Sequence, residues 1–413
     1  MLSNYLKIAV KVLLRRKFYT FVSLFGIAFT LTILMLGSAM LDNVVFPNAP
    51  ETKLDRMLTI DRAKMSGPNS SSTSAPGYLL LDRYARDLPG VETFSIISDP
   101  DKVPSFIDGE KIESYLRRTD GAFWEIMEFE FIEGSPFTED DNLAGNFVAV
   151  INETTRERLF DGGSAVGKKL RADGNAFTVV GVVRDVPMIR MACFSEIWAP
   201  IGSFRSTAYR EDWLSGFMGI VLAEDRDKLP QIQEEFQSRL AAIELPDPER
   251  YDTLQSSAFT RFEAISHHLA EDDWSDAPVV RFTLLVGSLA LLFMALPVLN
   301  LINLSLSRIL ERSSEIGVRK AFGASSWTLV GQFLVESVVL TLIGGALGLA
   351  LSALAIRMLG NADFIPYAQL SLNFRVFLYG LAFALAFGIL SGAYPAWRMS
   401  RLHPVEALHG RAK

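Results

Sequence analysis

Residues 18–41 read FYTFVSLFGIAFTLTILMLGSAML and contain no charged residue. A helix rises about 1.5 Å per residue, so roughly 20 apolar residues cross the hydrocarbon core of a bilayer, which is about 30 Å thick. We therefore predict transmembrane helix 1 over residues 18–41. A cleaved signal peptide fits less well, because the run is too long and no clear small-x-small cleavage site follows it.

Three later segments have the same apolar character, at residues 281–307, 326–356 and 376–397. A charge at the centre of a membrane helix costs about 2.5–3.5 kcal/mol, and only Glu336 interrupts the interior of these runs. The predicted fold class is an α-helical membrane domain of four transmembrane helices. A large extracytoplasmic α+β domain, residues 42–280, is inserted between helices 1 and 2.

The composition fits this division between lipid and water. Of 413 residues, 49% are hydrophobic and 21% are charged, and the mean hydropathy is +0.24. The hydropathy is high for a soluble protein, and the charge content is high for a chain lying wholly in lipid. Cys193 is the single cysteine, which excludes an intramolecular disulfide and a cysteine-ligated metal cluster.

Lysine and arginine residues predict the orientation. They are concentrated in residues 1–17, 308–325 and 398–413, whereas the short loop at 357–375 is poorer in positive charge. Cytoplasmic loops carry an excess of positive charge, so both termini and the 308–325 loop are predicted to be cytoplasmic. Residues 42–280 and the 357–375 loop are then outside.

The N-terminal residues 1–17 also have helical spacing. Leu6, Val10 and Leu13 share one face, while Lys7 and Lys11 lie on another. This pattern indicates a cytoplasmic amphipathic segment on the membrane surface. The alternative is a plain basic flank that only sets the orientation.

The segment outside the membrane alternates strand and helix signals. We predict strands, rich in β-branched residues, at 147–151 and 177–183 and helices at 79–88, 154–160 and 229–243, with a flexible loop over 66–76. These elements predict a mixed α+β domain.

Gly162–Lys169 reads GGSAVGKK and matches most of the phosphate-binding pattern G-x4-G-K-[ST]. The last position is Lys169, so the hydroxyl that would bind magnesium is missing. No buried strand is predicted before the segment, and the predicted topology places it away from cytoplasmic ATP. We therefore interpret it as a surface turn with a basic edge.

The histidines offer a weak metal-site hypothesis. His267 and His268 are adjacent, so their side chains diverge on a helix or strand. The acidic residues Glu271, Asp272 and Asp273 follow, and a solvated acidic turn explains them better than a metal site.

Six blocks carry a resemblance to a known family. The four outside blocks resemble the MacB-type periplasmic core domain, and the last two resemble the FtsX-like permease domain. In chain order they are 119–137 (TDGAFWEIMEFEFIEGSPF), 147–160 (FVAVINETTRERLF), 165–170 (AVGKKL), 177–187 (FTVVGVVRDVP), 308–324 (RILERSSEIGVRKAFGA) and 394–408 (YPAWRMSRLHPVEAL).

The resemblance implies the permease subunit of an ABC transporter in the bacterial inner membrane. It implies a dimer, formed with a second copy or a related permease, and leaves room for a periplasmic adaptor. No intact ATP-binding motif is present here, so the resemblance implies a separate ABC ATPase subunit that binds ATP and magnesium. This chain would then be non-catalytic and bind no cofactor, metal or nucleic acid.

Two functions are consistent with this family. The first is export of a peptide, drug or lipoprotein-like substrate, driven by movement of the outside domain. The second is an FtsX-like regulator that signals to an extracytoplasmic partner without transport. The large outside domain favours export. A membrane-anchored enzyme or receptor has no supporting residue constellation.

The resemblance places ATPase docking in the 308–325 loop. Its charged and glycine positions offer a polar docking surface, although an ordinary orientation-setting loop would also contain them. The predicted docking residues are Glu311, Arg312, Glu315, Gly317, Arg319, Lys320 and Gly323.

Small residues recur four apart in the last two predicted spans, which puts each set on one helix face and suits close packing. The alternative is that small residues are simply common in membrane helices. These residues are Gly344, Gly348 and Ser352, and then Ala384, Gly388 and Gly392. Glu336 is expected either to face a polar interior or a partner helix, or to lie near the interface and snorkel.

Overall fold

The computed structural model contains two compact units, which are described separately. The helical unit comprises residues 1–42, 283–364 and 370–413, and the α+β unit comprises residues 43–282 and 365–369. The residues that the structure describes are 2–15, 17–45, 47–107, 110–245, 247, 249–270, 274–275, 277–292, 295, 318, 325–360 and 372–400.

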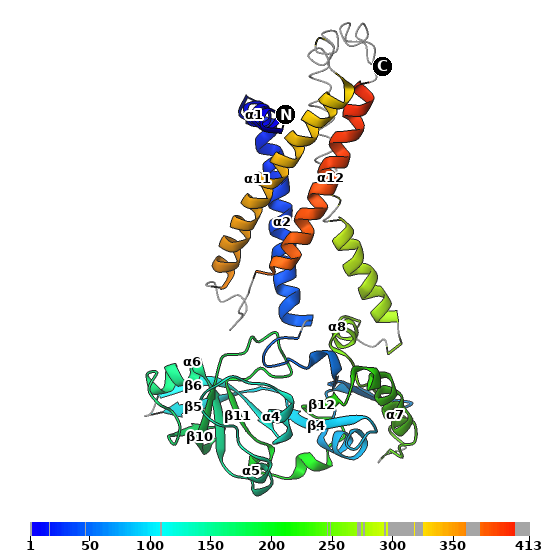
Figure 1. Cartoon of the computed structure of the whole chain (residues 1–413). Helices are drawn as coiled ribbons and strands as arrows, with labels where there is room; N and C mark the ends of the chain where they lie inside the picture. Colours follow the sequence, from blue (N-terminus) through cyan, green and yellow to red (C-terminus); the bar gives the residue numbers. More distant parts are fainter. Residues whose placement is uncertain are drawn as a thin grey trace. The chain divides into compact units, whose positions relative to one another are not determined.

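The described part of the helical unit contains a short amphipathic helix, α1, followed by long apolar helices (Figure 1). They are α1 (Leu2–Arg15), α2 (Lys17–Val45), α11 (Ser326–Gly360) and α12 (Phe374–Ser400). A further apolar helix, Ala277–Leu292, runs into this unit.

Two described segments, Lys17–Ala39 and Val330–Leu359, are long and apolar enough to cross a membrane. The apolar parts of the other two predicted spans, Ala277–Leu292 and Phe374–Leu390, are shorter. The count of four spans and the predicted boundaries of the cytoplasmic segments stay predictions.

Aliphatic and aromatic side chains pack where α2, α11 and α12 meet. Ile27, Leu31 and Met35 of α2 are buried against Leu340 of α11 and Phe377 of α12. Ile27, Leu31 and Met35 follow one another at intervals of four positions along α2, which puts them on one helix face. The three helices therefore share a common apolar core.

A ten-stranded mixed sheet forms the centre of the α+β unit. Its strands are β1 (Met57–Ile60), β4 (Val91–Ser98), β5 (Asp101–Ile107), β6 (Glu110–Thr119), β7 (Phe131–Gly134), β8 (Val148–Asn152), β9 (Lys169–Ala172), β10 (Asn175–Val183), β11 (Ile197–Pro200) and β12 (Phe217–Ala223).

Part of this sheet closes on itself. The strand order is β1-β12-β4-β6-β11-β8-β10-β9-β5, and β5 also pairs with β6, so six strands from β6 to β5 form a ring. Each of the six contributes buried apolar side chains to one cluster, which includes Leu116, Ile151 and Phe177. Strands β8 and β10 are parallel and are joined through α6 (Glu153–Phe160).

The helices of the α+β unit cover this sheet and its extension. They include α3 (Tyr78–Leu80), α4 (Ala122–Ile126), α5 (Glu139–Ala144), α6, α7 (Leu229–Ala241) and α8 (Arg261–Leu269). Strands β8 and β10 and helices α6 and α7 confirm the elements predicted at those positions. The helix predicted over 79–88 is wrong in extent, because α3 continues as a π-helical segment, Leu81–Ala85, and helical structure ends there.

A second sheet has the order β13-β2-β3, with β13 at Thr253–Ser256, β2 at Ala63–Ser66 and β3 at Ser71–Ser74. The loop predicted over 66–76 is therefore wrong for Ser71–Ser74. The turn residues between them behave as expected, since the Gly67 amide donates to the Ser70 carbonyl at 2.8 Å. That turn brings the serines into register with β2, and backbone pairing outweighs their weak strand preference.

Helix α7 gives a test of the core. Phe236 is fully buried, whereas Glu234, two residues earlier, is exposed. Replacing Phe236 with Ala removes the ring and leaves a cavity, so Phe236→Ala should lower the free energy of unfolding by about 3–5 kcal/mol. Thermal unfolding of the full chain in detergent measures this, with Glu234→Ala as the control that should leave the midpoint nearly unchanged. Equal midpoints for the two variants would contradict the assignment of Phe236 to the core.

Candidate functional site

The predicted ATPase-docking residues lie outside the described residues. This holds for Glu311, Arg312, Glu315, Gly317, Arg319, Lys320 and Gly323. Their docking role stays a prediction. Among the described residues, two other regions are candidates for a functional role. The first is the contact between α2, α11 and α12, and the second is a buried charge cluster in the α+β unit.

Glycines of α11 lie against α2. A Cβ atom built on Gly344 would stand 2.9 Å from Cβ of Ile27, and one on Gly348 would stand 3.1 Å from the Ala28 carbonyl oxygen. The Thr32 hydroxyl, on α2, donates to the Gly348 carbonyl at 3.3 Å, and the buried Ser352 hydroxyl donates to the same oxygen at 2.6 Å. The two helices therefore meet with little more than backbone between them.

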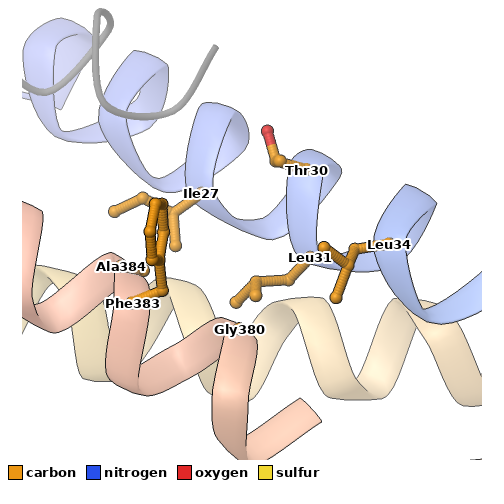
Figure 2. A pocket seen from close by; sticks show the side chains of 7 residues that line it. All are labelled: Ile27, Thr30, Leu31, Leu34, Gly380, Phe383 and Ala384. Atoms are coloured by element: carbon orange, nitrogen blue, oxygen red, sulfur yellow. The ribbon is translucent and has the colours of Figure 1, made fainter. Parts of the chain in front are cut away.

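A small apolar pocket separates α2 from α12 (Figure 2). Its lining side chains come from these two helices: Ile27, Thr30, Leu31, Leu34, Gly380, Phe383 and Ala384. Ala384 and Gly388 are buried, and Gly392 lies in α12 in a segment whose side-chain surroundings are not described. The role of these small residues in helix packing stays a prediction.

Glu336 is 2% exposed on α11. The Gln332 side-chain amide, one turn earlier, donates to Glu336 Oε1 at 3.1 Å. A hydrogen bond of this kind lowers the cost of holding a polar group in an apolar environment. The structure describes how Glu336 is accommodated, and a function for it stays a prediction.

The α2–α11 contact yields a test. Gly344→Leu should separate the helices, because Ile27 already occupies the space of a first side-chain carbon. Overpacking of this kind costs about 1–3 kcal/mol. The measurement is the temperature at which the detergent-solubilised chain loses its monodisperse peak in size-exclusion chromatography. Gly37→Leu is the control, because Gly37 of α2 is exposed with no atom within 4 Å of its built Cβ. If Gly344→Leu and Gly37→Leu lower this temperature equally, close packing at Gly344 is contradicted.

The second region centres on Glu51, which is fully buried. Arg190 Nη1 lies 2.7 Å from Glu51 Oε2, and its side chain is 1% exposed. Arg261, the first residue of α8, donates to the other carboxylate oxygen. Arg190 Nη1 also donates to the Asn48 carbonyl at 3.3 Å. One buried carboxylate therefore joins three distant segments of the chain.

A neighbouring buried arginine holds the loop that carries Arg190. Arg117 donates to the carbonyl of Ala192 at 2.8 Å and to that of Met191 at 2.6 Å. Burial lowers the pKa of Arg117 to about 10, so the guanidinium remains charged at neutral pH. Burial also raises the pKa of the Cys193 thiol, which keeps it protonated and unreactive.

Helix α8 makes further contacts within the α+β unit. The side chains of His267 and His268 diverge, as predicted: the His267 ring stacks on Phe259 with centroids 4.4 Å apart, and His268 Nε2 lies 2.9 Å from Asp61 Oδ2. The hydrogen bond to Asp61 raises the pKa of His268. Glu271, Asp272 and Asp273 lie outside the described residues, and the described residues contain no group of three potential metal ligands.

Glu51 yields a stability test. Replacing it by Gln leaves Arg190 charged and almost fully buried without its carboxylate, and breaking a buried pair in this way costs about 3–5 kcal/mol. Chemical unfolding of the full chain, followed by tryptophan fluorescence, measures the loss. The control is Glu130→Gln, since Glu130 pairs with Arg184 at an exposed site. A Glu51→Gln variant as stable as Glu130→Gln would show that the cluster is not a buried ion pair in solution.

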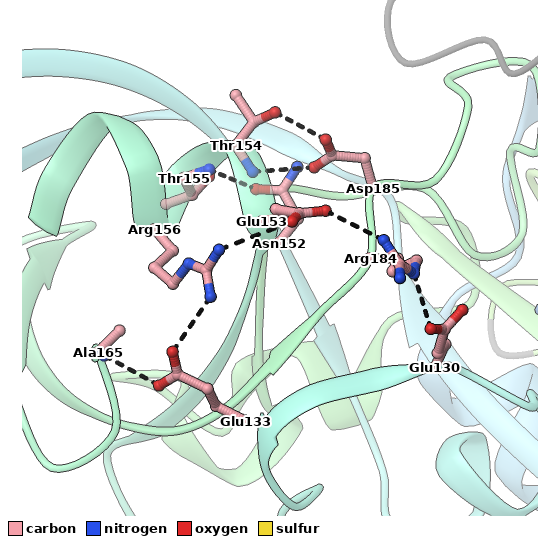
Figure 3. A network of polar contacts seen from close by, with 10 residues as sticks. All are labelled: Glu130, Glu133, Asn152, Glu153, Thr154, Thr155, Arg156, Ala165, Arg184 and Asp185. Carbon is pink, nitrogen blue, oxygen red and sulfur yellow. Dashed lines mark hydrogen bonds and ion pairs between the residues drawn. The ribbon is translucent and has the colours of Figure 1, made fainter. Parts of the chain in front are cut away.

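The structure also explains the phosphate-loop-like segment Gly162–Lys169. The Glu133 carboxylate accepts from the Ser164 hydroxyl at 3.0 Å. It also accepts from the Ala165 amide at 3.2 Å (Figure 3). The Lys168 ammonium lies 5.1 Å from the centre of the Phe160 ring. A carboxylate of the chain itself thus binds a hydroxyl and a backbone amide of this segment, which agrees with the interpretation as a surface turn.

A chain of ion pairs extends from Glu133. Arg156 Nη1 donates to Glu133 at 3.1 Å, and Arg156 also pairs with Glu153, which in turn faces Arg184 (Figure 3). Partial burial raises the pKa of Glu133, but the hydrogen bonds from Ala165, Ser164 and Arg156 outweigh it and leave that pKa below its usual value. Asp185 accepts from the amide and hydroxyl of Thr154. These contacts fix the start of α6 to the end of β10.

Sequence reasoning did not find the Glu51 cluster. Glu51 is separated by 139 positions from Arg190 and by 210 from Arg261. No local pattern marks a carboxylate whose partners are so distant. The only hint is a lone acidic residue placed directly after the turn-forming segment Pro47–Pro50.

Two family models match this chain, one after the other. The model of the MacB-like periplasmic core domain matches residues 21–239, which is more than half of the chain, and that of the FtsX-like permease C-terminal domain matches residues 287–404. The chain therefore belongs to the MacB/FtsX-type family of ABC transporter permeases.

Individual relatives support the same family. The chain is 25% identical over 354 residues to the ABC transporter permease YknZ of Bacillus subtilis, covering 84% of this chain and 82% of YknZ. It is 28% identical over 282 residues to the macrolide export ATP-binding/permease protein MacB of Bdellovibrio bacteriovorus. That match covers 67% of this chain but only 41% of MacB.

Solved structures of outside domains are also similar. The extracellular domain of YknZ matches with a TM-score of 0.35 and 18% identity, covering 48% of this chain and 98% of that domain. The periplasmic region of MacB from Actinobacillus actinomycetemcomitans matches with a TM-score of 0.38 and 12% identity, covering 53% of this chain and 94% of that region.

Proposed function

We propose that this chain couples ATP hydrolysis by a separate ABC ATPase subunit to movement of its α+β unit, and thereby exports a peptide, drug or lipoprotein-like substrate. The observation that carries the proposal is the match of both domain models in the order expected of such a permease. Relatives named as macrolide and pyoverdine exporters support the direction of transport.

The proposed topology has four spans in the bacterial inner membrane, with both termini in the cytoplasm and the α+β unit outside. The positive charge in residues 1–17, 308–325 and 398–413 supports this orientation. A second permease copy or a related permease completes the transporter as a dimer, and a periplasmic adaptor is a further proposed partner.

The described helices support a mechanical role rather than a polar channel. Glycines bring α11 close to α2, and the pocket between α2 and α12 is lined almost wholly by apolar side chains. A hydrophilic substrate finds few partners in such surroundings. We therefore place the substrate on the extracytoplasmic side, where the α+β unit acts on it while ATP is hydrolysed on the partner.

ATPase partnership is tested by purification of the tagged chain from native membranes in mild detergent, with mass spectrometry of the proteins recovered. We expect a soluble ABC ATPase to co-purify with the wild-type chain. Charge reversal at the predicted docking site, Glu315→Arg with Arg319→Glu, should lower its recovery at least about tenfold, because docking there is polar.

The matched control reverses an exposed ion pair in the α+β unit, Glu130→Arg with Arg184→Glu, and should leave ATPase recovery unchanged. If no ATPase is recovered with an intact wild-type chain, the transport proposal fails and the regulator of an extracytoplasmic partner becomes the better explanation. Equal recovery with both reversed variants would contradict the docking site alone.

A further inference from the structure

Within the residues that the structure describes, the main chain leaves the α+β unit toward apolar helices at two points. One is the segment that follows α2, which ends at Val45, and the other is α8, which precedes the apolar helix Ala277–Leu292. We call these segments the entry, residues 47–53, and the exit, residues 260–269. Glu51 lies in the entry, and Arg261 lies at the start of the exit.

The entry is stiff and well anchored. Pro47 and Pro50 restrict its backbone, because the proline ring fixes φ. The Glu128 amide donates to the Pro50 carbonyl at 2.8 Å, and the Thr52 hydroxyl donates to the Glu128 carboxylate at 2.7 Å. These contacts therefore fix the position of Glu51 within the α+β unit.

The exit is also a rigid element. Thr260 and Glu263 form a capping box at the start of α8, in which each side chain accepts from the other residue's amide. At the other end of α8, His268 is bonded to Asp61. The capping box positions Arg261, the first residue of α8, and the Arg261 guanidinium is directed to Glu51.

The link between the two segments is a single carboxylate. Glu51 Oε1 accepts from Arg261 and Oε2 from Arg190, so entry, exit and the Arg190 loop meet at one buried group. Water is excluded here, since Glu51 is fully buried and the Arg261 side chain is 13% exposed. Charge-assisted hydrogen bonds are stronger in such surroundings, and two acceptor oxygens fix the directions of both arginines.

We propose that Glu51 and Arg261 form a coupling clamp that makes the entry and exit of the α+β unit move as one body. Glu51 and Arg261 are thus positioning residues for the conformational step, an inference that rests on the proposed function. Nucleotide-driven movement of the apolar helices then turns the α+β unit as a whole, instead of shifting its two ends independently.

The variant that tests the clamp is Arg261→Gln. It cuts the entry–exit link but leaves the buried pair Glu51–Arg190 intact, so the unit should still fold. The matched control is Arg156→Gln, because Arg156 has a similar exposure of 14% and pairs with Glu133 at 3.1 Å, away from both ends. Arg261→Lys retains the charge and should behave as the wild type.

The first measurement is hydrogen exchange of the detergent-solubilised full chain, without ATPase. In Arg261→Gln the amides of the entry and of the first turn of α8 should exchange about tenfold faster, because local opening becomes easier there, while β8 is unchanged. Arg156→Gln should not accelerate either segment. Equal exchange of the entry and exit in the two variants would overturn the clamp.

The second measurement uses the complex with its co-purified ATPase, with and without a non-hydrolysable ATP analogue. In the wild type and in Arg261→Lys, the analogue should change exchange in the entry and exit together. In Arg261→Gln the two changes should differ by more than about threefold. Matched changes in Arg261→Gln would refute the clamp and leave the proposed function standing. Absence of any change in the wild-type complex would refute the proposed function and the clamp with it.

Discussion

The interaction on which the α+β unit depends is a carboxylate buried among arginines. Holding a carboxylate in the interior without a charged partner is prohibitively costly, so Glu51 needs such a partner there; Arg190 supplies it, and Arg261 adds a second one. The same carboxylate therefore holds together the segment after α2, the Arg190 loop and α8. Arg117 also belongs to this network, because its guanidinium binds two carbonyl groups of the loop that carries Arg190.

The two units are stabilised by different means. In the α+β unit, six strands close into a ring around a cluster of aliphatic and aromatic side chains, so apolar burial from water supplies the driving force. In the helical unit, lipid is as apolar as the side chains, and close approach matters more. Gly344 and Gly348 allow α11 to reach the backbone of α2, and Thr32 adds a hydrogen bond across the contact.

Much of this architecture could be predicted because its causes are local. A run without charge predicted the long helix α2, an apolar run interrupted only by Glu336 predicted α11, and β-branched runs predicted β8 and β10. Strand β3 was missed because serines favour loops, and only the pairing with β2 makes them a strand. The Glu51 cluster could not be predicted, since it depends on residues that only the folded chain brings together. The predicted docking residues lie outside the described part of the chain.

Cys193 has a consequence for how such a protein can be studied. It is the single cysteine of the chain, and it lies fully buried beside Arg190 and Arg117. A thiol-reactive dye or spin label reacts with accessible thiolates, and burial holds this thiol in its neutral form. The folded chain is therefore its own cysteine-free background: a label would report only on a cysteine placed by design, and the native residue would not have to be replaced.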